Sequence, residues 1–146
     1  MANIFDVAKY ILEQTGPLST MKLQKLCYYA QAWSLVWDDE PLFDEDFQAW
    51  KNGPVCYELF NIHRGQFKLS AKDIDTNLLS KPYLTDNQKD SINIVLAHYG
   101  DKNAQYLSQL SHSEDPWKEA RHNLAPSENC ETPITKESMA RYYSGL

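Results

Sequence analysis

The sequence lacks several features that mark particular protein classes. Its three cysteines are odd in number and far apart, which fits a reducing compartment better than a disulfide framework. Its five glycines are scattered and form no phosphate-binding loop. Residues 1–14 mix charged and apolar side chains, and no run approaches about 18 apolar residues, so we expect neither a secretory signal nor a membrane span. Together these absences predict a cytoplasmic protein.

Positive charge is also scarce. Lysine and arginine number 14 against 20 for aspartate and glutamate, which gives a net charge of −6. Phosphate backbones are bound by clustered cations, and no helix carries the cluster of basic and amide side chains that reads a major groove. The composition therefore argues against nucleic acid as the ligand. An acidic surface would suit a basic partner.

No metal site or cofactor is predicted. The histidines and cysteines form no C-x-x-C or H-x-x-x-H pair, and free cysteines are usually buried for packing. A Cys/His nucleophile pair stays open because such residues meet only in the fold. His112 has the most polar neighbourhood of the four histidines, although ending or capping a helix is the more common role for such a residue. The acidic run at 44–46 is read as a solvated edge.

Hydrophobic periodicity predicts a mainly α, compact single-domain helical fold with one small β-hairpin. Asn3 is a candidate cap for the first helix, and Thr85 with Gln88 forms a capping-box pair. Asp115 is expected to cap a helix whose first residue is Pro116. The helices are expected over 4–14, 19–37, 55–63, 85–100 and 104–111, and from 115 and 135 onward. A long connection over 66–84 has room for one more short helix.

The stretch from Ser19 to Trp37 is expected to organise the chain. Its apolar residues recur at steps of three and four, which places them on one helix face, namely Leu23, Leu26, Cys27, Ala30, Trp33 and Trp37. Lys22, Lys25 and Gln31 are assigned to its exposed side. A hairpin is expected to follow over 41–51, with its polar tip at 44–46 and its end at Asn52-Gly53-Pro54.

Aromatic residues are abundant, with four tryptophans and nine tyrosines. Large aromatic side chains mainly build cores, but tryptophan and tyrosine also dominate protein interfaces. Any of them that are exposed, such as Trp50 or Tyr28, are therefore candidates for contact with a partner.

Three blocks of sequence resemble a known family. They are K-L-Q-K-L-C-Y-Y-A-Q-A-W at 22–33, then P-L-F at 41–43 with F-Q-A-W-K-N-G-P-V at 47–55, and L-S-H-S-E-D-P-W at 110–117. In this order they resemble the Panacea domain, also called the SocA-like or phage-associated antitoxin domain. On this resemblance residues 1–146 form a single Panacea domain. The family usually has tyrosine where Asn52 stands.

The resemblance implies a mainly helical protein that is encoded in prophages or mobile elements beside a toxin gene. It implies no enzyme, but an antitoxin that neutralises its cognate toxin by direct protein–protein contact. The toxins paired with this family are diverse and include enzymes that pyrophosphorylate transfer RNA and others that block translation or replication. One alternative is an adaptor that delivers the toxin to a cellular protease. Another is an enzyme that reverses the product of the toxin, with His112 and Glu114 or Asp115 as its site.

These considerations assign two sets of residues. We expect contact with the toxin from the hairpin and the exposed side of the second helix, at Lys22, Lys25, Tyr28, Trp50, Lys51 and Asn52. The remaining motif residues are expected to fill the core, form the tight turn and start a helix. This structural set comprises Leu23, Leu26, Trp33, Gly53, Pro54, His112, Pro116 and Trp117.

Overall fold

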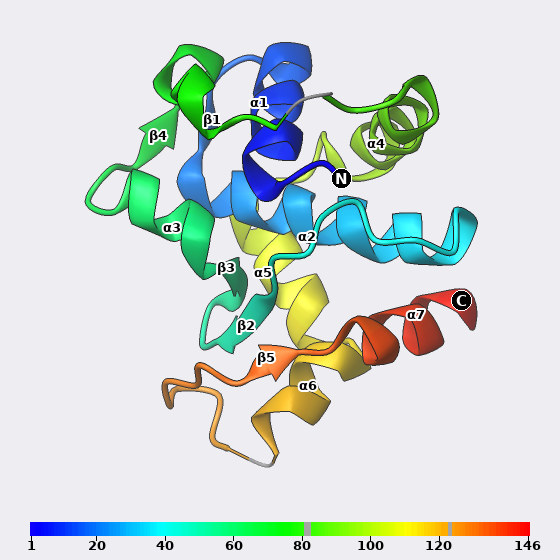
Figure 1. Ribbon diagram of the computed structural model, residues 1–146. Helices are drawn as coiled ribbons and strands as arrows, with labels where there is room; N and C mark the ends of the chain where they lie inside the picture. The colour runs from blue at the N-terminus through cyan, green and yellow to red at the C-terminus, as the bar shows by residue number, and fades with distance from the viewer. Residues whose placement is uncertain (81–82, 123) are drawn as a thin grey trace.

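One long helix, α2 (Thr20–Trp37), runs through the middle of the molecule (Figure 1). The computed structural model describes residues 1–80, 83–122 and 124–146. In Figure 1, α1, β1 and β4 lie on one side of α2, and α6, β5 and α7 lie on the other. The other elements are α1 (Ile4–Thr15), β1 (Leu18–Ser19), β2 (Phe47–Trp50), β3 (Gly53–Cys56), α3 (Tyr57–His63), β4 (Lys68–Leu69), α4 (Asp86–Tyr99), α5 (Ala104–His112), α6 (Asp115–Arg121), β5 (Pro133–Ile134) and α7 (Lys136–Ser144). The mainly helical fold is therefore confirmed.

Helix α2 is enclosed on almost all sides. It contacts α1, α4, α5, α7 and β3, and every residue from Leu23 to Ala32 is buried. Lys25 and Gln31 lie among the buried residues, so the expectation that they are exposed was wrong. Periodicity identified the apolar face, but the neighbouring elements also cover the face that carries the polar residues.

Buried glutamines of α2 hold the chain around it. The side chain of Gln31 accepts a hydrogen bond from Leu42 N (2.7 Å) and donates one to Phe43 O (2.8 Å). Gln24 acts in the same way on Cys56, with Oε1 accepting from Cys56 N (2.8 Å) and Nε2 donating to Cys56 O (3.1 Å). These amides satisfy backbone groups that would otherwise be buried without partners.

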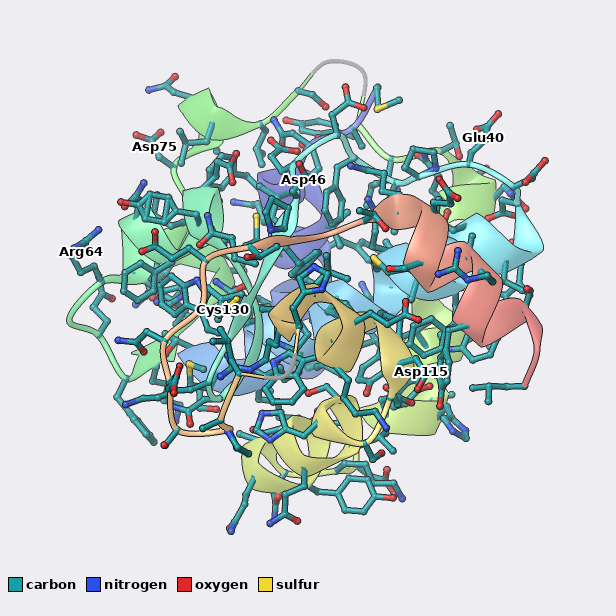
Figure 2. The ribbon with its side chains drawn as sticks, turned by 90° about the horizontal axis from the view of Figure 1, so that it is seen from below. Glu40, Asp46, Arg64, Asp75, Asp115 and Cys130 are labelled. Atoms are coloured by element: carbon teal, nitrogen blue, oxygen red, sulfur yellow. The ribbon has the colours of Figure 1, made fainter. Side chains whose placement is uncertain are left out.

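The hairpin lies further along the chain than expected. Strands β2 and β3 pair from Phe47 with Cys56 to Trp50 with Gly53, so residues 51–52 form the turn. Residues 41–43 form no arm of the hairpin but a loop, to which Gln31 bonds at Leu42 N and Phe43 O. The acidic run is no hairpin tip either: Asp46, labelled in Figure 2, pairs with Lys136 at 2.9 Å.

Two further parts of the sheet structure were not predicted. β5 pairs antiparallel with β2, which makes a three-stranded sheet, and β1 pairs with β4. The helix expected from Val55 starts at Tyr57, because Val55 and Cys56 belong to β3. The connection over 66–84 contains β4 and the 3₁₀ turns Ala71–Asp73 and Thr76–Leu78, and its residues 81 and 82 lie outside the described residues.

Most of the expected helix starts are confirmed. Asn3 and Thr85 form capping boxes with Asp6 and Gln88, and Thr135 caps α7 by accepting from Ser138 N. Asp115 was wrongly assigned as the cap of α6. Glu114 occupies that position, and Asp115 is the first helical residue (labelled in Figure 2). No helix within the described residues is long and apolar enough to cross a membrane.

We predict that Gln31→Leu destabilises the fold by about 2–4 kcal/mol, because the Leu42 N–H and the Phe43 carbonyl would be left buried without partners. Chemical denaturation with urea measures this difference. Gln105→Leu on the exposed face of α5 is the control, and it should change the unfolding free energy by less than about 0.5 kcal/mol. Equal effects of the two substitutions would contradict the prediction.

Candidate functional site

The three sequence blocks meet at one place, which we call the hairpin junction. It consists of Lys25 from α2, the turn at 51–53, His112 from α5 and Trp117 from α6. A Cβ atom on Gly53 would lie 2.5 Å from Lys25 Cε and 3.0 Å from Ser111 Oγ. The three segments are thus in direct contact although they are widely separated in the sequence.

Side chains of α5 and α6 hold the hairpin through its carbonyl groups. Trp117 Nε1 donates to Trp50 O (2.8 Å), and Ser108 Oγ donates to Asn52 O (2.6 Å). Arg121 Nη1 donates to Ala49 O (2.7 Å). Because three separate donors fix successive parts of the hairpin, its turn is presented to solvent in a defined conformation.

Lys25 lies beneath this turn in an unusual environment. Its side chain is fully buried, and Nζ has no hydrogen-bond partner among the described residues. Burial lowers the pKa of Lys25 to about 7, because the charged form loses its hydration. Gly53, at φ +114°, leaves the space that the lysine side chain occupies.

His112 lies against Trp117, with ring centroids 4.0 Å apart and an angle of 21° between the ring planes. Its Nε2 atom is buried and has no hydrogen-bond partner in the part of the chain that the structure describes. The pKa of His112 is lowered by burial and then by the positive charges of Lys25 and Arg121. This environment favours a neutral imidazole at neutral pH.

A cluster of tyrosines around Glu114 supports the junction from the core side. The hydroxyls of Tyr29 and Tyr143 each donate to Glu114 Oε1 at 2.7 Å, and Tyr143 also bonds to the hydroxyl of Tyr28 (3.1 Å). Burial raises the pKa of Glu114, although the two hydroxyl donors lower it. This cluster fixes the start of α6, and hence the position of Trp117.

His112, Glu114 and Asp115 were the residues considered for an enzyme site, and Asp115 is exposed with its carboxylate 3.7 Å from the ammonium group of Lys118. Glu114 is engaged by two tyrosines, and no hydrogen bond between described residues joins it to His112. Within residues 1–80, 83–122 and 124–146, no three His, Cys, Asp or Glu side chains are grouped so that they could hold a metal ion.

The residues predicted to contact a toxin fall into three groups. Lys51 and Asn52 are exposed at the hairpin turn, beside the half-buried Trp50. Lys22 is half-buried, and its Nζ donates to Gly100 O (2.6 Å). Lys25 and Tyr28 are buried, at 0% and 1% exposure, so neither offers surface to a partner in this conformation.

The structural set of motif residues mostly lies where core and turn positions were expected. Leu23, Leu26 and Trp117 are buried, while Trp33 is half-buried and donates from Nε1 to Tyr99 OH (2.9 Å). Gly53 and Pro54 begin β3, and Pro116 lies in the first turn of α6. Sequence reasoning missed Ser108 and Arg121, whose partners are backbone carbonyls distant in the sequence. It considered Glu114 only for an enzyme site and did not predict its two tyrosine partners.

A family model described as antitoxin SocA-like, Panacea domain, matches residues 23–118. The chain belongs to this family. The antitoxin SocA of Caulobacter vibrioides (strain NA1000 / CB15N) is 32% identical over 124 residues, which cover 76% of this chain and 66% of that protein. The chain thus spans slightly less than two thirds of the length of this curated relative. No solved structure matches the chain.

The first prediction from the junction concerns Gly53. Gly53→Ala should destabilise the protein by about 2–4 kcal/mol, because the added Cβ meets Lys25 and a non-glycine residue is strained at this φ. Gly65→Ala is the matched control: its φ is +81° and nothing lies within 4 Å of the added Cβ, so only about 1 kcal/mol of backbone strain is expected. Urea denaturation compares the two variants, and a smaller loss at Gly53 would refute the proposed packing.

A second prediction concerns Lys25. With a pKa of about 7 when folded and 10.5 when unfolded, the unfolded chain binds more protons between these values, so the lysine makes stability rise with pH in this window. Lys25→Met removes this contribution and should stabilise the protein by about 1–4 kcal/mol at pH 7.5.

Between pH 7.5 and 9.5 the stability advantage of the variant should shrink by about 2–3 kcal/mol, because the unfolded wild-type chain holds its extra proton on Lys25 less favourably as the pH rises over this range. Tyrosine and cysteine titrations are common to both proteins and cancel in the difference. Thermal and urea unfolding at the two pH values measure it. A destabilised Met variant, or a difference independent of pH, would show that the buried amine has a partner.

Proposed function

We propose that the chain is an antitoxin that binds a cognate toxin protein, encoded by a neighbouring gene, and neutralises it by direct contact. Membership of the antitoxin SocA-like family carries this proposal. Beyond family membership, we propose that this chain binds its toxin at a fixed ratio and performs no catalysis.

The hairpin turn is the proposed contact surface. Lys51 and Asn52 are exposed, and side chains of α5 and α6 hold the carbonyl groups of Asn52 itself and of the two residues before Lys51. A surface that is ordered before binding loses little conformational entropy when the complex forms. Trp50 adds a large aromatic group, which packs against Phe60 with ring centroids 4.9 Å apart.

Titration of the purified chain against the product of the neighbouring gene tests the function. We expect a stable complex with a sharp end point at a fixed ratio, and loss of toxin activity at that ratio. Rescue far below equivalence without a complex would instead indicate catalysis. A fall in the amount of toxin in cells, with no inhibition by the purified chain, would indicate delivery to a protease.

Lys51→Glu tests the proposed surface. Reversing the charge at the turn should weaken the complex by about tenfold or more, since a charge at an interface acts on both affinity and association rate. Lys72→Glu, an exposed lysine in the 3₁₀ turn Ala71–Asp73, is the matched control and should bind as the wild type does. Isothermal calorimetry measures both. Tight binding by Lys51→Glu would move the interface elsewhere while leaving the antitoxin function intact.

A further inference from the structure

A hollow of about 370 Å³ adjoins the hairpin junction. We call it the cationic cavity, and it is lined by His112, Trp117, Lys118, Arg121, Leu124 and Pro126. Its volume lies in the range of cavities that hold small ligands or a single inserted side chain. Two of its six lining residues, Lys118 and Arg121, are positively charged at neutral pH, in a chain whose net charge is −6.

Arg121 provides the main argument. Its side chain is buried at 2% exposure, and its guanidinium group donates to the carbonyls of Ala49 (2.7 Å), Ala125 (2.9 Å) and Glu128. Nε has no partner, and no ion pair within the described part of the chain joins Arg121 to a carboxylate. Buried charges in proteins are normally paired, so this charge lacks its usual compensation.

The neighbouring groups point to the same chemistry. His112 has a buried Nε2 without a partner, and it lies on Trp117, whose ring is 4.7 Å from the Arg121 guanidinium carbon. Lys118 is half exposed and only 3.7 Å from Asp115, a loose pair that leaves its ammonium group available. Among the described residues, His112 and Arg121 supply two of the three buried polar atoms that lack a partner.

We propose that the cationic cavity binds an oxyanion, a carboxylate or phosphate group, next to Arg121 and Lys118. Such a group would balance the positive charge of the guanidinium. It would also accept hydrogen bonds from charged donors, and these are stronger than hydrogen bonds between neutral groups. A free small acid and an acidic side chain of a partner protein offer the same chemistry. The proposal concerns the chain alone and does not depend on the antitoxin function.

Titration of the ¹⁵N-labelled chain with benzoate, followed by NMR, tests the proposal. Benzoate should shift the side-chain signals of His112 and Trp117 and the backbone signals around Arg121, and the shifts should saturate. Benzamide has the same ring and nearly the same shape without the charge, so it should leave these signals unchanged. Equal responses to benzoate and benzamide would overturn the proposal.

Two lysine variants distinguish specific binding of benzoate at the cavity from a general electrostatic attraction of anions to the protein. Lys118→Glu should weaken benzoate binding by about tenfold or more, because it places a negative charge at the cavity. Lys102→Glu is the matched control, since Lys102 also lies near an adjacent carboxylate, 3.6 Å from Asp101, but away from the cavity. Equal losses in the two variants would overturn the proposal. Lys118→Gln provides a milder change should the glutamate variant fail to fold, which its NMR spectrum reveals.

Two further probes identify the source of the oxyanion. N-acetylglutamic acid α-amide presents a side-chain carboxylate in a peptide setting, and inorganic phosphate represents free anions. Tighter binding of the glutamate derivative would assign the cavity to an acidic residue of a partner protein, and tighter binding of phosphate to a free anion. Both results support the proposal, whereas saturable binding by none of the three anions would refute it.

Discussion

Enclosure of α2 on nearly all sides governs the rest of this structure. A helix buried in this way must satisfy its polar side chains inside the protein, because water cannot reach them. Gln24 and Gln31 do so by bonding to the backbone at Cys56 and at residues 42–43, and thereby fix the end of the hairpin and the loop before it. The polar residues of α2 thus position the segments that a purely apolar helix would leave unspecified.

Lys25 is the buried polar residue of α2 whose side chain is not satisfied among the described residues. It lies close to two other unsatisfied groups. Lys25 Nζ, His112 Nε2 and Arg121 Nε are the buried polar side-chain atoms without partners in the described residues, and all three belong to the hairpin junction or the cavity beside it. Such groups lower stability wherever they occur. The other buried side-chain nitrogen and oxygen atoms of the described residues are paired. A concentration of unpaired groups at one place is typical of a site kept for function at the expense of stability.

The sequence predicted those parts of the fold that have local causes. Capping at Asn3, Thr85 and Thr135 depends on residues within one helical turn, so these starts were predicted. Strand pairing between β2 and β5 joins residues more than 80 positions apart, and nothing local in either segment signals it. Periodicity also assigned Lys25 to the surface, since it cannot reveal that other elements cover the polar side of α2. The family motifs identified the residues of the junction without indicating that they touch.

The hairpin turn and the cationic cavity are adjacent, and this arrangement has a physical consequence for binding. The net charge of −6 repels free anions at long range, so a small acid gains little from steering toward the cavity. An acidic side chain on a protein already docked at Lys51 and Asn52 would be held near the cavity at a high effective concentration. Contact with the buried Arg121 would then raise the affinity for a partner whose carboxylate lies at the right distance from the turn. A partner without such a carboxylate would bind less tightly. In this arrangement the turn provides the main contact area, and the cavity beside it selects partners that carry a suitably placed carboxylate.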